Sequence, residues 1–227
     1  MSTAHSLSET LPNPEYVRSF PDLTLVGVVH DHPASIERVR SVVRESDLET
    51  LALELPPLAV PLYRSYAASD SPSIGGEMSA AIQASEAAVV GIDGPSRAFA
   101  RVFYHYARRE RLDRETVKRL WTSVRAASTR AVRCRIAATA VTRGLEVEDE
   151  RSFNYDCDPR DSIEERATDE RSHVSAARTV GALSPPHVVH RDAIREDCMA
   201  TVLRERRGPI VAVVGIDHLD GLVSRLQ

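Results

Sequence analysis

Two histidines close apolar runs in the same way, each with a glycine three positions before it. One motif occupies residues 27–30 and ends at His30, and the other occupies residues 215–218 and ends at His218. Glycine there allows backbone or ligand to approach closely, and a histidine at a strand end offers a ring nitrogen to a metal or to a proton in transit. One such motif carries little information, whereas two of them, both after apolar runs, indicate a shared site.

A glutamate, Glu54, lies inside an apolar run that stops at Pro56. A carboxylate in such a run must be paired, bind a metal or lie exposed at the strand end, because burying it alone is very costly. A salt bridge to a nearby arginine explains it without any function. Together with His30 and His218, a role as metal ligand or general base is the better explanation.

Two arginines, Arg191 and Arg195, are four residues apart and therefore share a face of a predicted helix. Guanidinium groups there could orient a substrate carboxylate or stabilise a developing oxyanion. Two solvated arginines of an arginine-rich chain explain the spacing at least as well. Of the pair, we expect Arg195 to have the catalytic role and Arg191 to be an additional candidate.

Two further acidic residues are candidates for the same site. Asp93 precedes Gly94 and Pro95, where an aspartate is as readily a turn former or a helix N-cap as a functional group. Glu77 begins a predicted helix, where the helix dipole alone favours a negative charge. Both are therefore expected as additional site residues beside Glu54.

His30 and His32 also form an HxH sequence, which supports an alternative function. Binuclear metal hydrolases of the amidohydrolase and polymerase-and-histidinol-phosphatase type have HxH at the end of their first strand. Those enzymes need further histidines at successive strand ends. Here the histidines at positions 105, 173, 187 and 190 fall in helical or loop sequence, so this alternative ranks below the first hypothesis.

Apolar runs and helical patterns alternate along the chain and predict the elements that hold these residues. Strands are predicted at residues 23–29, 50–55, 88–93 and 209–218, and helices at 34–45 with Ser35 as N-cap, at 77–87 and at 190–206. The alternation predicts an α/β fold, with a central, mainly parallel sheet flanked by helices. The carboxyl ends of its strands would bring His30, Glu54 and Asp93 to one edge, where such folds bind ligands.

The length and charge pattern predict one domain with a helical insertion. The chain has 227 residues, 42% of them hydrophobic, and a net charge of -4, which favours a packed core and excludes wholesale disorder. Residues 1–20 are expected to be a loosely ordered lead-in and 21–227 a single domain. Within it, 97–184 form a helical, charge-segregated middle section.

The middle section contains two blocks of opposite charge. Residues 97–143 have 13 basic and 3 acidic side chains, and residues 144–173 have 11 acidic and 4 basic ones. The two blocks could clamp a charged ligand, but the simpler expectation is that they face each other or water. Nucleic acid is a weaker alternative partner, and the near-neutral total does not favour it.

The spacing of the cysteines and the hydropathy of the chain indicate in which cellular compartment the protein is located. Cys134, Cys157 and Cys198 match neither a zinc-binding spacing nor a disulfide framework. The first twenty residues lack a signal-peptide pattern, and no apolar run reaches the length that spans a bilayer. We therefore expect a soluble cytoplasmic protein without a membrane span.

These motifs, in this order, resemble the TraB and PrgY family of pheromone-shutdown proteins, part of a superfamily with the Tiki and GumN proteins. The resemblance covers residues 25–57, 75–95 and 194–222 and is poor in the middle. The family's paired GxxH motifs and strand-borne glutamate fall on His30, His218 and Glu54. Its second glutamate falls on Glu77 and its helical arginine on Arg195. Gly94 departs from the family, which commonly has arginine there.

The resemblance implies a metal-dependent hydrolase, and Tiki-like members act as proteases. The leading hypothesis is accordingly a metal-dependent hydrolase, a peptidase acting on a peptide signal, with Mn, Co or Zn bound by His30, His218 and Glu54. Such a metal lowers the pKa of water toward neutrality. The competing class is a binding or regulatory module that captures a peptide or small molecule without turnover. Relatives often continue into membrane helices, and this chain is expected to be the soluble domain alone.

Overall fold

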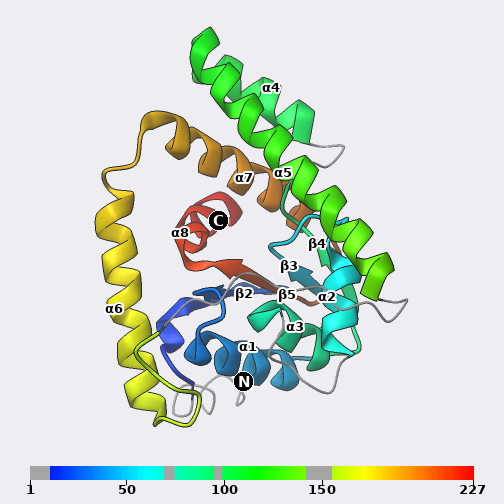
Figure 1. Cartoon of the computed structure of the whole chain (residues 1–227), viewed down its shortest axis with the longest axis vertical. Helices are drawn as coiled ribbons and strands as arrows, with labels where there is room; N and C mark the ends of the chain where they lie inside the picture. The colour runs from blue at the N-terminus through cyan, green and yellow to red at the C-terminus, as the bar shows by residue number, and fades with distance from the viewer. Residues whose placement is uncertain (1–10, 69–74, 95–98, 142–154) are drawn as a thin grey trace.

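The computed structural model of this chain describes residues 11–68, 75–94, 99–141 and 155–227, and these form an α/β fold (Figure 1). The strands are β1 (Val17–Ser19), β2 (Leu23–Val28), β3 (Thr50–Leu53), β4 (Ala88–Gly91) and β5 (Ile210–Gly215). The helices are the short 3-10 helix η2 (Pro14–Tyr16), α1 (Pro33–Glu45), α2 (Val60–Ala67), α3 (Gly76–Gln83), α4 (Phe99–Arg109), α5 (Arg114–Val141), α6 (Ile163–Gly181), α7 (Pro186–Arg204) and α8 (Ile216–Leu226).

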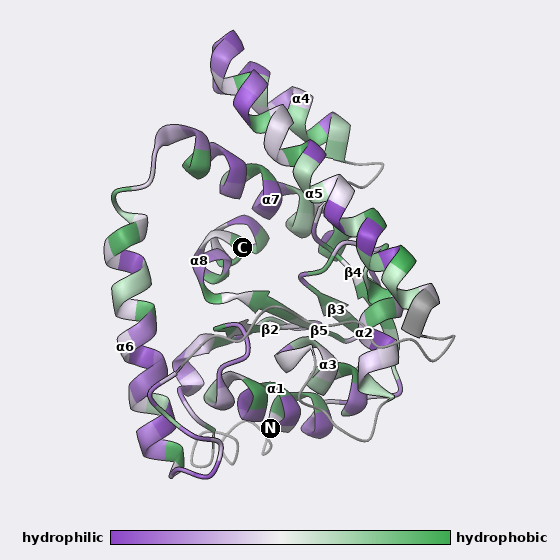
Figure 2. Cartoon of the chain, in the orientation of Figure 1, coloured by the Kyte–Doolittle hydropathy of each residue, from purple (hydrophilic) through white to green (hydrophobic). Residues whose placement is uncertain are grey.

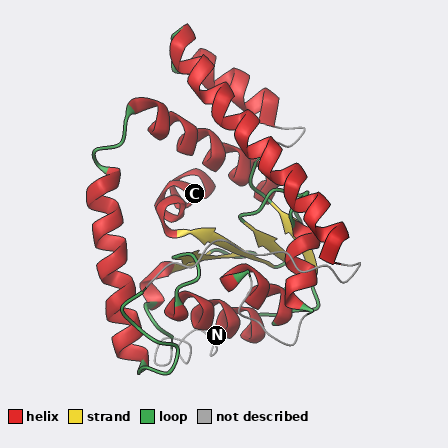
Figure 3. Cartoon of the chain, viewed as in Figure 1, coloured by secondary structure: helices red, strands yellow, loops and turns green. Residues whose placement is uncertain are grey.

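The five strands form one sheet in the order β1-β2-β5-β3-β4. Figure 3 shows the strands in yellow with helices on both sides. Strands β2, β5, β3 and β4 are parallel, and the short edge strand β1 is antiparallel to β2. The predicted mainly parallel sheet with flanking helices is therefore confirmed. Because the parallel strands end on the same side, the residues that follow β2, β3, β4 and β5 lie along one edge.

Alternate strand residues face two separate hydrophobic cores, as the two-residue period of a strand requires. On one face Leu25, Ala52 and Ala212 pack with residues of α7 and α8, and on the other Leu51 and Val213 pack with residues of α1 and α3. Figure 2 shows β5 and β3 as hydrophobic between these helix layers. A sheet covered on both faces holds its strand ends rigidly, which suits a site at that edge.

The glycine of the first motif is needed for packing. An alanine at Gly27 would place its Cβ 2.8 Å from Cδ1 of Ile216 and 2.9 Å from Cδ2 of Leu219, both on α8. We expect Gly27→Ala to lower the free energy of unfolding by about 1–3 kcal/mol through overpacking, measured by denaturant titration. Gly181→Ala is the control, because no described atom lies within 4 Å of a Cβ there. Equal stability of the two variants would contradict the prediction.

A buried ion pair joins α1 to α6. The guanidinium of Arg38 donates to both carboxylate oxygens of Glu170, at 2.8 and 2.7 Å, and both side chains are fully buried. Arg38 also donates to the carbonyl of Gly27 at 2.7 Å, and Asn13 donates to Glu170 at 2.6 Å. Helix α6 is thus attached to the sheet through charges whose hydrogen bonds are satisfied.

The N-terminal lead-in prediction is wrong for the described residues 14–19. These form η2 and β1, and β1 pairs with β2 so that Val17 lies opposite Val26. The physical reason is tertiary: Tyr16 is buried in the core, and the Arg38 guanidinium lies 5.2 Å from the centre of its ring. Residues 1–10 of the predicted lead-in lie outside the described residues.

Two local predictions are also wrong. The N-cap of α1 is His32, whose Nδ1 accepts a hydrogen bond from Ala34 N at 3.1 Å, while Ser35 instead accepts one from Val29 N at 2.8 Å. The last strand ends at Gly215, so His218 lies in the first turn of α8 and not on a strand. Side chains that begin a helix after a parallel strand still face the same sheet edge.

The two charge blocks lie on opposite sides of the molecule, as Figure 1 shows for α5 and α6. Most of the described basic residues on α5 are exposed, among them Arg114, Lys118, Arg125 and Arg133. The described part of the acidic block, residues 155–173, belongs to α6 and the segment before it. Most charged side chains of these described parts therefore face water and do not form a clamp, whereas Glu170 is buried against Arg38. Residues 142–154 lie outside the described residues.

Within the part of the chain that the structure describes, every helix is too short or too polar to cross a bilayer.

Candidate functional site

Arg195, on α7, connects the carboxyl ends of two strands. Its Nε and Nη2 donate to the two carboxylate oxygens of Asp93, after β4, at 3.1 and 2.9 Å. Its Nη2 also donates to Oε1 of Glu54, after β3, at 2.6 Å. Burial lowers the pKa of Arg195, but the charges of Asp93 and Glu54 more than offset this and raise it. The guanidinium therefore stays a cation. Glu54 forms the salt bridge to an arginine that the sequence suggested, and it lies at the end of a strand as predicted.

Glu54 is held on its other side by the backbone of the second motif. Gly215 N donates to Oε2 of Glu54 at 2.5 Å, and only 6% of the Glu54 side chain is exposed. The remaining oxygen, Oε1, lies 3.6 Å from Nε2 of His218. A buried carboxylate thus has one fixed oxygen and one oxygen directed toward the histidine and the guanidinium.

His218 is oriented by a buried glutamate of α7. Its Nδ1 lies 3.1 Å from Oε1 of Glu196, and its Nε2 lies 2.8 Å from Nη1 of Arg195. Since arginine can only donate, neutral His218 has its proton on Nδ1 and its lone pair on Nε2. Burial lowers the pKa of His218, but the hydrogen bond with Glu196 and the charge of Glu54 raise it by more.

His30 is oriented in the same way by a second buried glutamate. Its Nδ1 donates to Oε1 of Glu77 at 2.7 Å, and the other oxygen of Glu77 accepts from Asp31 N at 2.9 Å. Glu77 is buried, whereas 57% of the His30 side chain is exposed. The hydrogen bond to Glu77 raises the pKa of His30 to about 9, against the effect of burial, and the nearby charge of Glu54 adds to the rise.

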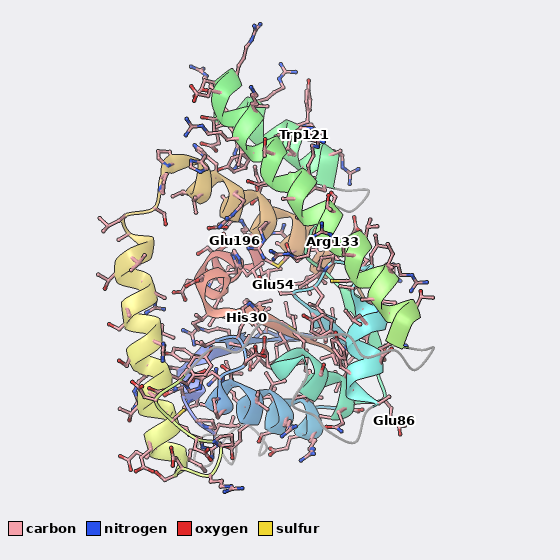
Figure 4. All side chains as sticks on the ribbon, viewed as in Figure 1. His30, Glu54, Glu86, Trp121, Arg133 and Glu196 are labelled. Carbon is pink, nitrogen blue, oxygen red and sulfur yellow. The ribbon has the colours of Figure 1, made fainter. Side chains whose placement is uncertain are left out.

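The two motif histidines therefore share one arrangement. Each has Nδ1 against a buried glutamate, Glu77 for His30 and Glu196 for His218, which leaves Nε2 as the available ring nitrogen. Figure 4 shows His30, Glu54 and Glu196 in the middle of the molecule, at the end of the strands. Carboxylates that hold the second nitrogen are characteristic of histidines that bind a metal, because they fix the ring and increase its basicity.

The donor types of His30, His218 and Glu54 suit a divalent metal, but these three are not among the described residues whose ligand atoms all lie within 4.8 Å of one another, so metal binding would require them to move closer together. Two imidazole Nε2 atoms and a carboxylate oxygen suit zinc, cobalt or manganese. Arg195 contacts two of the same atoms, Nε2 of His218 and Oε1 of Glu54. A metal bound by these residues would therefore have to replace those two contacts of Arg195, while its pair with Asp93 is independent of them.

His32 belongs to a different cluster. Among the described residues, the ligand atoms of His32, Cys157 and Asp169 lie within 4.8 Å of one another. Because Nδ1 of His32 accepts from Ala34 N, its Nε2 must carry the proton that is donated to Asp169 at 3.1 Å. Burial and the hydrogen bond to Asp169 raise the pKa of the Cys157 thiol to about 12. These protonation states suit a hydrogen-bonded structural cluster, and HxH does not direct both rings to one site.

Of the predicted residues, His30, Glu54, Glu77, Asp93, Arg195 and His218 lie at the sheet edge, and His32 does not. Arg191 lies one turn from Arg195, but its Nε donates to Asp192 at 2.9 Å and 44% of its side chain is exposed. It therefore borders the site without joining the network around Glu54.

Glu196 is the functional residue that the sequence interpretation missed. Besides His218 it binds Nη1 of Arg225 at 2.7 Å, and a Cβ on Gly221 would collide with its carboxylate. Helical spacing in the sequence could have identified Glu196, because Met199 and Leu203, three and seven residues further on, lie on the same helix face and are core residues. A glutamate on such a face needs partners, and His218 and Arg225 supply them.

Fold and site together define an α/β protein with a mostly parallel sheet and a polar, two-histidine site at the carboxyl edge of its strands. Comparison with protein-family models, curated proteins and solved structures finds no match for this chain. Membership of the TraB and PrgY family therefore stays a prediction from the motifs.

Proposed function

We propose that this chain is a metal-dependent hydrolase, of the peptidase kind, that acts on a peptide signal and belongs to the TraB and PrgY family. The observation that carries the proposal is the pair of carboxylate-oriented histidines, His30 with Glu77 and His218 with Glu196, beside Glu54. The three cysteines are free, consistent with a cytoplasmic location, which is part of the proposal.

In this proposal each residue has a definite task. His30, His218 and Glu54 would hold the metal, which would supply Lewis acidity and a more acidic water. Arg195, fixed by its two bonds to Asp93, orients the scissile carbonyl and stabilises the negative charge that develops on its oxygen. Glu77 and Glu196 keep the imidazole rings in the binding tautomer.

Metal binding is the first test. The metal-free protein is titrated with Zn²⁺, Mn²⁺ or Co²⁺ in a calorimeter, and we expect one site whose affinity falls at least about 100-fold in the double variant His30→Ala, His218→Ala. His105→Ala is the matched control, because His105 is exposed on α4. If wild type and the double variant bind alike, the assigned site is wrong.

Turnover separates the hydrolase from the binding module. A peptide library is incubated with the metal-loaded protein, and its composition is followed by mass spectrometry. Cleavage that needs metal and is lost in the double variant supports the hydrolase. Stoichiometric capture without cleavage, under every metal, supports the binding module instead.

A further inference from the structure

An apolar cavity lies directly beside the candidate site. Its walls are formed by Phe99 and Phe103 of α4, Leu120 and Val124 of α5, and Ile194 of α7, and its volume is about 70 Å³. Asp93 and Arg195 of the candidate site also line it. The cavity is therefore continuous with the network that holds Glu54.

The lining of the cavity combines apolar side chains with charged side chains of the candidate site, and this combination suits one kind of ligand. Its wall is hydrocarbon, with Phe99 and Phe103 stacked at 6.0 Å between ring centres. Asp93 and Arg195 of the candidate site contribute charged groups to the lining, and 27% of the Arg195 side chain is exposed, while Ser123 and Arg191 add further polar groups. A ligand with a polar backbone at Arg195 and an apolar side chain beside it matches this pattern.

The volume limits the size of that side chain. An engineered apolar cavity of about 150 Å³ binds benzene, and this one, at about 70 Å³, is about half as large. A branched aliphatic group fits, whereas a phenyl or indole ring does not fit without movement of the walls. One methylene group more or less in a hydrophobic pocket changes kcat/KM for a substrate by about 10-fold or more, so such a pocket can distinguish side chains of different size.

We propose that this cavity is a side-chain subsite, which selects peptides with valine or leucine next to the bond held at Arg195. The inference rests on the proposed function, because it assigns the substrate class of that same site. Entry is from the surface, since Ala127, on the rim, is exposed on α5.

The subsite is tested first by binding, without turnover. Backbone amide NMR signals are followed while N-acetyl-leucinamide, N-acetyl-valinamide or N-acetyl-tryptophanamide is added to the wild-type protein. We expect the first two to shift Leu120 and Ile194 and the third to bind about 10-fold more weakly. Absence of these shifts up to the solubility of the probes, or equal binding of all three, would overturn the subsite.

A filled cavity gives the second readout. Ala127→Phe introduces a ring at the rim, and Ala126→Phe, on the exposed neighbouring position that does not line the cavity, is its control. We expect Ala127→Phe to weaken N-acetyl-leucinamide binding at least 10-fold and Ala126→Phe to leave it unchanged. Equal affinity of the two variants would contradict the assignment.

Cleavage distinguishes failure of the subsite from failure of the hydrolase. Quenched fluorescent peptides that differ only in valine, leucine or tryptophan at one position are compared with metal-loaded protein. If the cleavage rate does not depend on that residue or on Ala127→Phe, the subsite proposal is wrong and the hydrolase proposal stands. If the probes bind but no peptide is cleaved, the subsite proposal stands and the hydrolase proposal is wrong.

Discussion

Glu170→Gln is expected to lower the free energy of unfolding by about 3–5 kcal/mol, the cost of leaving a buried charge without its partner. The variant keeps the size of the side chain but leaves Arg38, which is fully buried, with a neutral amide in place of a carboxylate. Chemical denaturation followed by circular dichroism measures the loss. Glu86→Gln is the matched control, because Glu86 is exposed at the periphery (Figure 4), and it should change stability by less than about 0.5 kcal/mol.

The same ion pair predicts a pH dependence. Burial raises the pKa of Glu170, but its bonds to Arg38, Ser35 and Asn13 lower it by more, so the folded pKa is below the unfolded one. Its contribution to stability is therefore complete above the unfolded pKa, near 4.5, and is lost as pH falls through the folded pKa. Glu170→Gln should flatten the decline of stability in acid. Parallel acid profiles of variant and wild type would contradict the ion-pair explanation.

Arg195→Met is expected to destabilise the metal-free protein by about 2–3 kcal/mol and to make added Zn²⁺ more stabilising. The guanidinium is the cation that Glu54 and Asp93 share, and their side chains are only 6% and 14% exposed. Removing it leaves two largely buried carboxylates without that partner, which destabilises the fold. A divalent metal that uses Glu54 and His218 no longer competes with Arg195. Thermal melts of both proteins, with and without Zn²⁺, measure the two effects.

The control for Arg195→Met lies one turn away on the same helix. Arg191→Met removes a partly exposed arginine that pairs with Asp192, and exposed pairs contribute less than about 1 kcal/mol. If the two variants melt alike, the network around Arg195 adds nothing to stability. If Zn²⁺ stabilises wild type and Arg195→Met equally, metal and guanidinium do not share Glu54 and His218.

The strand ends were predictable from sequence because local chemistry marks them. The first apolar run stops at His30, and the runs that hold Glu54 and Asp93 are followed by proline or glycine. Parallel strands in an α/β fold end together. That reasoning brought three residues from distant segments to one edge, and the structure confirms the sheet that it required.

The partners of those residues were not predictable, because they depend on packing between distant helices. Glu196 faces His218 only because α7 packs against α8, and Glu170 meets Arg38 only because α6 packs against α1. The length of β1 explains another error: three residues at a sheet edge give no usable periodicity. His32 took the capping role predicted for Ser35 because its ring reaches Ala34 N.

Strand β5 is the last strand in the sequence but the middle one of the sheet. It pairs with β2 and β3, whose residues precede it by well over a hundred positions. During synthesis at about 5–20 residues per second, β2 and β3 lack the strand that lies between them until residues 210–215 have left the ribosome. The central part of the sheet, and the strand ends that hold His30, Glu54 and His218 along one edge, therefore assemble only after β5 has been synthesised.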